Sequence, residues 1–328
     1  MEDRDIFQEL GAAFQALNID ETQKMILMGN LHKLQNQKLN IMITGATGSG
    51  KSSTINAMFR REVAKVGVGV DPETMDITKY TLNNMILWDS PGLGDGKEAD
   101  TRHAKNIISK LNERDSDGNA LIDLVLVILD GSTRDLGTSY ELINSVIIPN
   151  LGDNKEQRIL VAINQCDMAM KGKHWDSVNN KPDEVLTKFL DEKAESVRRR
   201  IREGTGVDIE PVYYSAGYKD GDDQQAPYNL SKLLYLIIQH TPKKKRLIYA
   251  TTTSRDPEVW RDNDDLIDYG REIRSSFVDT IVECASEGAD IGGEIGGIFG
   301  KAGEVVGRVA GGIIGGVVGV VKSIFSWW

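Results

Sequence analysis

Residues 39–59 read LNIMITGATGSGKSSTINAMF, and the fold follows from this stretch. Apolar residues alternate with others up to Gly45, which predicts a β-strand, and helical spacing begins at Ser53 and continues to Phe59. The turn between them fits the pattern G-x-x-x-x-G-K-[ST], in which backbone N–H groups at a helix N-terminus form a concave nest. Such a nest binds polyphosphate, so the stretch predicts a strand, a phosphate-binding loop and a helix, in that order.

Each residue type in this loop has a physical reason. Glycine is needed where the chain takes positive φ or where a phosphate oxygen approaches the backbone. The ammonium of Lys51 is predicted to reach the β- and γ-phosphates, and the hydroxyl of Ser52 is predicted to bind Mg²⁺. The predicted phosphate-binding residues are Gly45, Ala46, Thr47, Gly48, Ser49, Gly50, Lys51, Ser52 and Ser53.

The composition is that of an ordinary soluble protein, with 40% apolar and 27% charged residues among 328. A net charge of −10 argues against DNA as a partner, because a general nucleic-acid binder needs a basic face. Cys166 and Cys284 lie far apart and in no metal-like spacing, which favours a reducing compartment without disulfides. The N-terminal stretch MEDRDIFQEL has no apolar signal-peptide segment, so we expect a cytoplasmic protein.

The apolar pattern divides the chain into four predicted regions. Residues 1–36 predict two accessory helices, the second opened by a capping box of Asp20 and Gln23. Residues 37–242 alternate strand-length apolar runs with helical stretches, which predicts an α/β fold, a doubly wound and mostly parallel sheet with helical additions at both ends. Residues 243–287 predict a linker and an accessory helix, and residues 288–328 predict a glycine-rich apolar tail. The predicted strands are residues 39–44, 76–82, 85–89, 122–130, 158–164 and 210–215.

Ligand-binding residues in such a sheet gather in the loops after the carboxyl ends of the strands. Asp89 ends one predicted strand and is placed to hold Mg²⁺ through water, while the N–H of Gly92 is placed to meet a γ-phosphate. Asp167 follows another strand, and its carboxylate can accept from the N1–H and 2-amino groups of guanine, which adenine lacks. The turn at Ser215 and Ala216 follows a third strand and offers a backbone N–H to guanine O6.

With these motifs in place, residues 37–242 resemble the Era-like and septin-like GTPases of the TRAFAC class. The run GATGSGKSSTINAM is similar to that of the bacterial YfjP-like, immunity-associated and chloroplast-import (Toc) GTPases. The resemblance implies that Mg²⁺ is held by Ser52, Asp89 and a threonine of the first switch segment, for which Thr74 is the candidate and Thr78 the alternative. It also implies that the guanine base is bound by Asn164, Gln165, Asp167, Ser215 and Ala216.

Two positions depart from the pattern of these families. Gln165 stands where the base-recognition motif usually has a lysine that packs along the nucleotide, and we expect the change to weaken GTP binding. Leu93 follows Gly92 at the place where Ras-like enzymes have a water-orienting glutamine, and leucine cannot orient water. Similar enzymes recover activity through a partner protomer, a bound potassium ion or another side chain. The potassium route usually needs an asparagine at the position of Gly48, which disfavours that route here.

Dimerisation across the nucleotide is therefore the leading hypothesis for activation. Residues 131–135, GSTRD, directly follow a core strand at a place from which Toc-like GTPases project an arginine toward the partner's nucleotide. Arg134 is the candidate, and an exposed arginine that caps the next helix is an equally good interpretation. His103 is a weaker acid–base candidate, for which a solvated surface histidine is the favoured interpretation. The predicted catalytic residues are Lys51, Thr74, Gly92 and Arg134.

Glycines recur four residues apart through much of residues 288–319, with Ile and Val between them. As helices, these stretches would carry small-residue stripes that permit close helix packing, although each glycine costs about 1 kcal/mol relative to alanine. A buried helical hairpin, an element that inserts into or lies on an anionic membrane, and a self-association zipper all stay open. We interpret the basic run at residues 243–246 as a solvated linker in preference to a membrane contact.

The sequence thus predicts a Mg²⁺-dependent GTPase that hydrolyses GTP to GDP and phosphate and is activated by nucleotide-dependent self-association as a homodimer or larger assembly. Its glycine-rich tail would serve membrane association or self-association. Two alternatives remain. One is a slow, GTP-gated interaction module that acts as a ribosome-associated factor or a scaffold. The other is a membrane-acting defence effector that depends on the tail.

Overall fold

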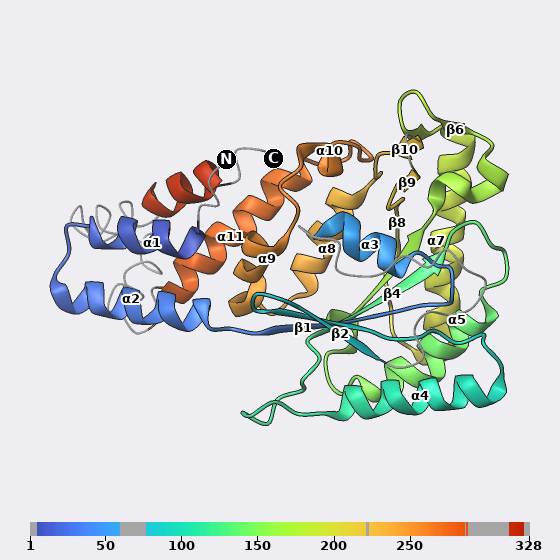
Figure 1. Ribbon diagram of the computed structural model, residues 1–328, viewed down its shortest axis with the longest axis horizontal. Coiled ribbons are helices and arrows are strands. Elements are labelled where there is room, and N and C mark those ends of the chain that lie inside the picture. The colour runs from blue at the N-terminus through green and yellow to red at the C-terminus, as the bar shows by residue number, and fades with distance from the viewer. Residues whose placement is uncertain (1–4, 60–76, 221–222, 286, 288–314, 325–328) are drawn as a thin grey trace. The chain divides into compact units, whose positions relative to one another are not determined.

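The protein is described here by a computed structural model that covers residues 5–59, 77–220, 223–285, 287 and 315–324 (Figure 1). The chain divides into two compact units. One unit combines residues from both ends of the sequence, Met1–Lys38, Pro242–Thr251 and Asp268–Trp328. The other consists of Leu39–Thr241 and Thr252–Ile267 and contains the main sheet.

The larger unit is built on a six-stranded sheet with the order β2-β3-β1-β4-β5-β8. Only β2 runs antiparallel to its neighbour; the other pairs are parallel. This arrangement confirms the predicted doubly wound, mostly parallel sheet, and each of its six strands falls in a predicted segment. The strands are β1 (Leu39–Thr44), β2 (Thr78–Leu82), β3 (Met85–Asp89), β4 (Leu124–Asp130), β5 (Ile159–Asn164) and β8 (Val212–Tyr213).

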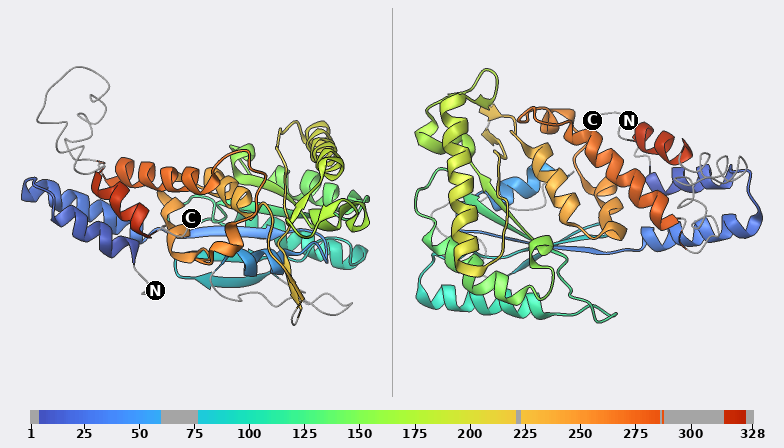
Figure 2. Two further views of the ribbon diagram at one scale, coloured as in Figure 1. Left: turned by 90° about the horizontal axis from the view of Figure 1, so that it is seen from above. Right: turned by 180° about the vertical axis from the view of Figure 1, so that it is seen from behind.

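The central strands are buried on both faces, as their unbroken apolar runs predict. Every residue of β5 is buried, and so is every residue of β4 except the last. Helices cover both faces of this sheet (Figures 1 and 2). On one face, alternate residues of β4 and β5 share an apolar cluster with α4 (Lys97–Asn112), the π-helix η1 (Leu142–Ile147) and α7 (Glu184–Thr205). The burial of this cluster holds the strand ends, and so the loops that follow them, at fixed positions.

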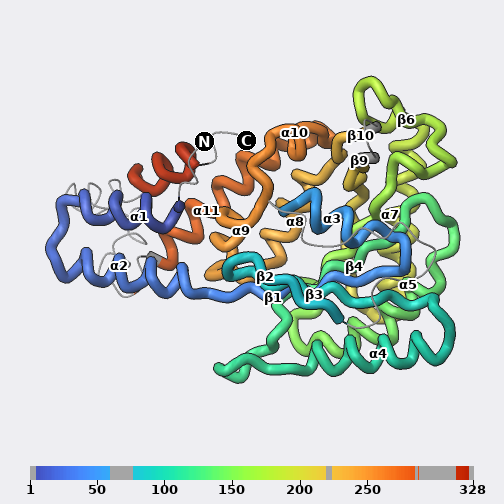
Figure 3. The backbone as a smooth tube through the Cα atoms, in the orientation of Figure 1, coloured from blue at the N-terminus to red at the C-terminus, as the bar shows by residue number. Residues whose placement is uncertain are grey.

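The remaining elements of this unit surround the sheet. Figure 3 shows the chain running from β1 through the phosphate-binding loop into α3 (Lys51–Met58), the helix that the sequence predicts after this loop. The other helices are α5 (Gly137–Glu141), η2 (Ile148–Asn150), α6 (Lys155–Arg158), η3 (Cys166–Gly172), α8 (Leu230–His240) and α10 (Pro257–Trp260). Two small hairpins pair β6 (Trp175–Asp176) with β7 (Lys181–Pro182) and β9 (Tyr218–Asp220) with β10 (Asp223–Gln225).

The second unit is helical. The predicted N-terminal pair forms α1 (Ile6–Gln15) and α2 (Glu21–Gln35), and the Asp20 carboxylate caps α2 by accepting from the Gln23 N–H. The helix α11 (Tyr269–Ala285) packs on α2 and on the 3₁₀ helix η4 (Lys243–Ile248), which leads into α9 (Tyr249–Thr252).

The basic run at residues 243–246 differs from the solvated linker that its composition suggests. It forms the start of η4, where Lys243 pairs with Glu283 at 2.8 Å and Lys244 with Glu287 at 2.9 Å. Arg246 donates to the Ser276 hydroxyl. The pairs are more than half exposed and so contribute little stability, but they occupy two of the four cations.

Of the glycine-rich tail, only the helix at residues 315–324 lies in the described part of the chain. This helix buries Val317, Val321 and Ile324, whereas a β-carbon added at Gly315 or Gly319 would meet no described atom within 4 Å. Apolar side chains, not these glycines, thus make its packed face. Residues 288–314 and Trp327 and Trp328, on which the hairpin, membrane and zipper hypotheses also depend, fall outside the described residues. Within the described ranges no helix has the length and apolar character needed to cross a bilayer.

A buried hydroxyl pair joins α3, the helix after the phosphate-binding loop, to Tyr214, the residue that follows β8. The Tyr214 hydroxyl lies 2.6 Å from the Thr54 Oγ1, and both side chains are fully buried. Because Thr54 donates its own proton to the Gly50 carbonyl, Tyr214 is the donor in the pair.

We expect Tyr214→Phe to lower the free energy of unfolding by about 1–1.5 kcal/mol, because it deletes a buried hydrogen bond while keeping the ring. Tyr213→Phe is the matched control, since its hydroxyl bonds Asp191 at an exposed site and should contribute less. Urea denaturation measures the free energy of unfolding of both variants. Equal decreases in the two variants would contradict the prediction.

Candidate functional site

The parallel register brings the predicted site residues to one edge of the sheet. Ile43 in β1 lies opposite Asp89 in β3, and Asp130 in β4 lies opposite Asn164 in β5. The loops that follow these strands therefore start side by side, as expected for the carboxyl edge of a parallel sheet. Ligand contacts from residues more than a hundred positions apart become local here.

The phosphate-binding loop is closed by its own lysine. The Lys51 ammonium donates to the Gly45 carbonyl at 3.0 Å and to the Ala46 carbonyl at 3.2 Å, which leaves one of its three N–H groups for a phosphate. Gly50 caps α3 with φ +85°, a left-handed conformation that favours glycine. A side chain at Gly50 would also displace the Asn164 amide from its present position.

Hydrogen bonds join the phosphate-binding loop to the predicted base-binding residues. The Asn164 amide donates to the Ser49 carbonyl at 3.0 Å, and its oxygen accepts from the Ala216 N–H at 3.0 Å. The turn at Ser215 and Ala216 was expected to offer a backbone N–H to guanine O6. In this structure the Ala216 N–H is engaged by Asn164 and the Ser215 N–H by the Tyr228 carbonyl. Asn164 thus links the phosphate-binding end of the site to the base-binding end by hydrogen bonds.

Gln165 makes a contact that the sequence reasoning missed. Its amide donates to the Gly48 carbonyl at 2.8 Å and so adds a second link between the base loop and the phosphate-binding loop. Gln165 takes a left-handed conformation with φ +58°, which turns its side chain back toward that loop. We expected weaker GTP binding because Gln165 replaces a lysine. The structure shows that Gln165 instead supports the phosphate-binding loop through its bond to Gly48.

The carboxylate of Asp89 lies at the centre of the site and is almost fully buried. Burial raises its pKa to about 6, with the nearby Lys51 ammonium acting in the opposite direction. Burial likewise lowers the pKa of Lys51, and Asp89 and Asp95 oppose that shift. The Asp89 carboxylate and the Lys51 ammonium therefore each favour the charged form of the other. Such a pair can bind a metal cation at the carboxylate and a phosphate at the ammonium.

Five buried oxygens at this edge of the sheet have no hydrogen-bond partner among the described residues. They belong to Thr44, Ser49, Asp89, Asp95 and Asp167. Leaving such atoms unpaired costs roughly 1–3 kcal/mol each, so their concentration here indicates a site shaped for a polar ligand. Asp167 is 7% exposed, and its free carboxylate oxygen fits the donors of a guanine edge. Asp89 and the Ser52 hydroxyl supply hard oxygen donors of the kind Mg²⁺ prefers.

The loop after β3 packs directly on the phosphate-binding loop. A side chain at Gly92 would overlap the Gly45 carbonyl, so only glycine permits this approach. Leu93 is 5% exposed and packs in the apolar cluster that also contains Ile107 of α4, so it presents no polar group to a water. His103 was expected on the surface but is 1% exposed, with Nδ1 3.0 Å from the Gly92 carbonyl, because α4 turns that face toward the loop.

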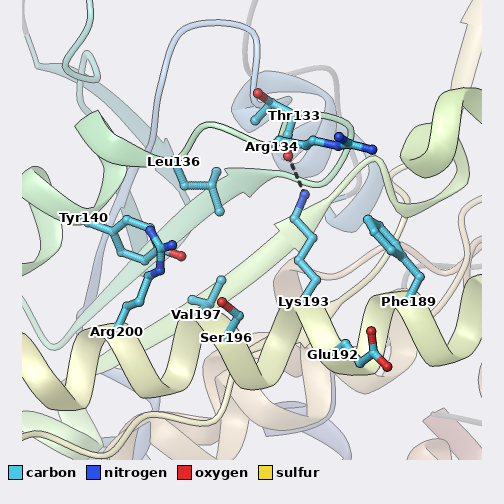
Figure 4. Close-up of a pocket in the computed structure, with 10 residues that line it drawn as sticks. All are labelled: Thr133, Arg134, Leu136, Tyr140, Phe189, Glu192, Lys193, Ser196, Val197 and Arg200. Carbon is cyan, nitrogen blue, oxygen red and sulfur yellow. Dashed lines mark hydrogen bonds between the residues drawn. The ribbon is translucent and has the colours of Figure 1, made fainter.

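The loop after β4 carries the candidate Arg134, which is exposed. Lys193 of α7 donates to the Gly131 carbonyl at 2.5 Å and the Thr133 carbonyl at 2.6 Å, and so anchors this loop. Figure 4 shows the bond to Thr133. Arg134 lines a pocket of about 320 Å³ between the loop and α7, where the Arg200 guanidinium lies 5.3 Å from the Tyr140 ring centroid. Burial lowers the pKa of Lys193, opposed by Asp130.

The structure thus brings together the residues predicted from the loops after β1, β3 and β5. Ser52 and Ser53 lie in the first turn of α3, and Ser215 forms a two-way backbone bridge with Tyr228. Thr74 lies outside the described residues, whereas its alternative Thr78 begins β2 and pairs with Asp89. In the part of the chain described, no three His, Cys, Asp or Glu side chains form a metal cluster.

Comparison with known proteins agrees with this geometry. Residues 40–165 match the family model described as 50S ribosome-binding GTPase. The protein YfjP of Escherichia coli K12 is 27% identical over 173 residues, which cover 52% of this chain and 55% of YfjP. Dynamin-like protein 1 of Campylobacter jejuni is 40% identical over 91 residues, covering 25% of this chain and 12% of that protein. The chain therefore spans about half or less of the length of these curated relatives.

Among solved structures, Toc33 from Arabidopsis thaliana in complex with GDP and Mg²⁺ is similar, with 16% identity and a TM-score of 0.43. The similarity covers 74% of this chain and 99% of that one. The match to the GTPase family over residues 40–165 contains the phosphate-binding loop and both carboxyl-edge loops that follow β3 and β4. Residues 40–165 of this chain thus match a family of P-loop GTPases.

Proposed function

We propose that this protein binds GTP with Mg²⁺ and hydrolyses it to GDP and phosphate. The observation that carries the proposal is the buried Asp167 carboxylate, whose unpaired oxygen lies in the loop that Asn164 and Gln165 join to the phosphate-binding loop. GTP fits both ends of this site. Its triphosphate is held by backbone N–H groups at one end, and its guanine edge is held by a carboxylate at the other.

The residues of this chain would act by positioning and charge. Lys51 and the backbone N–H groups of the phosphate-binding loop stabilise negative charge that develops as water attacks the γ-phosphate. The N–H of Gly92 marks the position of the γ-phosphate and so distinguishes GTP from GDP. Ser52 and Asp89 would hold Mg²⁺, which when bound neutralises charge on the β- and γ-phosphates. Thr74 remains the proposed third ligand from the first switch segment.

Hydrolysis by a single copy should be slow. Leu93 is packed in the core, so the position that often orients the attacking water has no polar side chain to do so. We propose that self-association supplies the missing group and that Arg134, exposed on an anchored loop, is that group. The same burial of Leu93 favours a second candidate, a GTP-gated interaction module in which binding matters more than turnover.

Base selection can be tested at Asp167. We expect wild type to prefer GTP strongly over ATP, and Asp167→Asn to lower GTP affinity by about 100-fold or more, because two charge-assisted hydrogen bonds are lost. The asparagine amide can instead donate to the C2 carbonyl of xanthine, so the variant should prefer XTP. Titration with fluorescent GTP, ATP and XTP measures both preferences. Equal affinity of wild type for GTP and ATP would refute the guanine site.

The buried Asp89 predicts a pH dependence. With a pKa of about 6, its carboxyl is mostly ionised above pH 6 and mostly protonated below, and only the ionised form can help to hold Mg²⁺. GTP affinity in Mg²⁺ should therefore fall as the pH drops from 7.5 to 5, approaching about tenfold per pH unit below 6. Asp89→Asn is the control, because the titration of the nucleotide itself is common to both proteins. Identical pH profiles would remove Asp89 from Mg²⁺ binding.

Self-association can be tested at Arg134. The specific activity of wild type should rise with protein concentration, and Arg134→Ala should abolish that rise, because the arginine is lost from the partner's site. Arg199→Ala, which removes another exposed arginine in the same unit, should behave as wild type. Turnover in Arg134→Ala that still rises with concentration would exclude Arg134. A flat rate near zero in wild type would favour the interaction module.

A further inference from the structure

Two side chains of α4 hold the backbone of the loop after β3. The Asp100 carboxylate accepts from the Gly94 N–H at 2.8 Å and from the Asp95 N–H at 3.1 Å. His103 lies three residues further along, on the same face of the helix, and its Nδ1 is 3.0 Å from the Gly92 carbonyl. The start of α4 thus contacts the backbone of three of the four residues from Gly92 to Asp95.

The hydrogen bond to the Gly92 carbonyl defines which ring nitrogen of His103 carries the proton. A carbonyl oxygen only accepts hydrogen bonds, so Nδ1 of His103 must carry a proton and donate it to Gly92. The other ring nitrogen, Nε2, is buried and has no partner among the residues that the structure describes. An unpaired buried nitrogen destabilises the fold, and an apolar side chain of similar size would fill the same space without that cost. Packing alone therefore does not account for a histidine here.

The position of Gly92 is restricted from three sides. Its α-carbon packs against the Gly45 carbonyl, where no side chain fits. Its carbonyl is held by His103, and the next residue, Leu93, is fixed in the apolar cluster that also contains Ile107 of α4. His103 and Leu93 thus hold the peptide that follows Gly92 and restrict rotation about the Cα–C bond of Gly92. The loop also touches the phosphate-binding loop through the Thr47 hydroxyl, 3.3 Å from the Asp95 carboxylate.

We propose that His103 is a positioning residue, which holds the Gly92 carbonyl and so limits the backbone conformations of Gly92 to those in which its N–H meets the γ-phosphate of GTP. This inference rests on the proposed function and adds to it the residue that positions the Gly92 N–H, the group that distinguishes GTP from GDP. The histidine acts through Gly92, by reducing the number of backbone conformations that the loop must give up when GTP binds.

The test compares His103→Leu, which deletes the donor, with His103→Asn, whose amide nitrogen takes the place of Nδ1. Wild type and both full-length variants are titrated with GDP and with a non-hydrolysable GTP analogue, and kcat and KM are measured for GTP. Thermal melting of each nucleotide-free protein reports stability separately. If the leucine variant does not fold, His103→Phe, which keeps a planar ring without a donor, replaces it.

We expect His103→Leu to melt close to wild type, because losing the unpaired Nε2 offsets losing the hydrogen bond. Its GDP affinity should be unchanged, while its affinity for the GTP analogue falls by about five- to tenfold, as for one lost hydrogen bond. The kcat for GTP should fall at least as much. His103→Asn should recover most of both losses.

An unchanged ratio of GTP-analogue to GDP affinity in His103→Leu would overturn the proposal, as would an asparagine variant no better than leucine. Equal losses for both nucleotides with a lower melting temperature would assign His103 a structural role only, which also overturns it. Failure of wild type to bind either nucleotide would refute the proposed function itself, and the positioning role with it.

Discussion

The loops that follow β1, β3 and β5 meet through backbone atoms and short amide contacts, and the site depends on this close approach. Gly92 lies against the Gly45 carbonyl with no room for a side chain, and the Asn164 amide reaches the Ser49 carbonyl past Gly50. Each contact holds one loop against another that is distant in sequence. A bulkier residue at Gly50 or Gly92 would separate the phosphate end of the site from the base end or from the loop after β3.

The same edge of the sheet carries an energetic cost that the core must offset. Buried, unpaired oxygens of Asp89 and Asp167 each cost on the order of 1–3 kcal/mol, against a total stability of about 5–15 kcal/mol for a typical domain. The fully buried strands β4 and β5 provide the apolar burial that tolerates this cost. A ligand that pairs these oxygens would therefore stabilise the fold as it binds. The unpaired oxygens that form the binding site thus lower the stability of the ligand-free fold, as is usual at a site for a polar ligand.

Two loops of the site are held by side chains that reach them from helices. His103 and Asp100 of α4 hold the loop after β3, and Lys193 of α7 holds the loop that carries Arg134 through two carbonyls. Glycine-rich loops have few side chains with which to anchor themselves, so anchors must come from elsewhere. Charged or polar groups on the helix faces over the sheet provide these anchors, and the helices are themselves fixed by the apolar cluster beneath them.

From the sequence alone, the strands of the main sheet, the phosphate-binding loop and the helix after it could be read, because periodic apolar spacing and a local glycine pattern report structure formed by neighbouring residues. The order of the strand-end residues also predicted which loops carry the site, since parallel strands end at one edge. Only the tertiary structure decided which groups pair across that edge.

The burial of His103 against Gly92, the bond from Gln165 to Gly48 and the pairing of Lys243 with Glu283 illustrate the difference. His103 was expected in solvent, but α4 buries it together with Ile107 and Leu111. Gln165 and Gly48 are separated by 117 positions, and no local spacing encodes such a contact. Spacing along the chain reports what a segment can form, whereas burial and long-range hydrogen bonds depend on which surfaces the assembled core brings together.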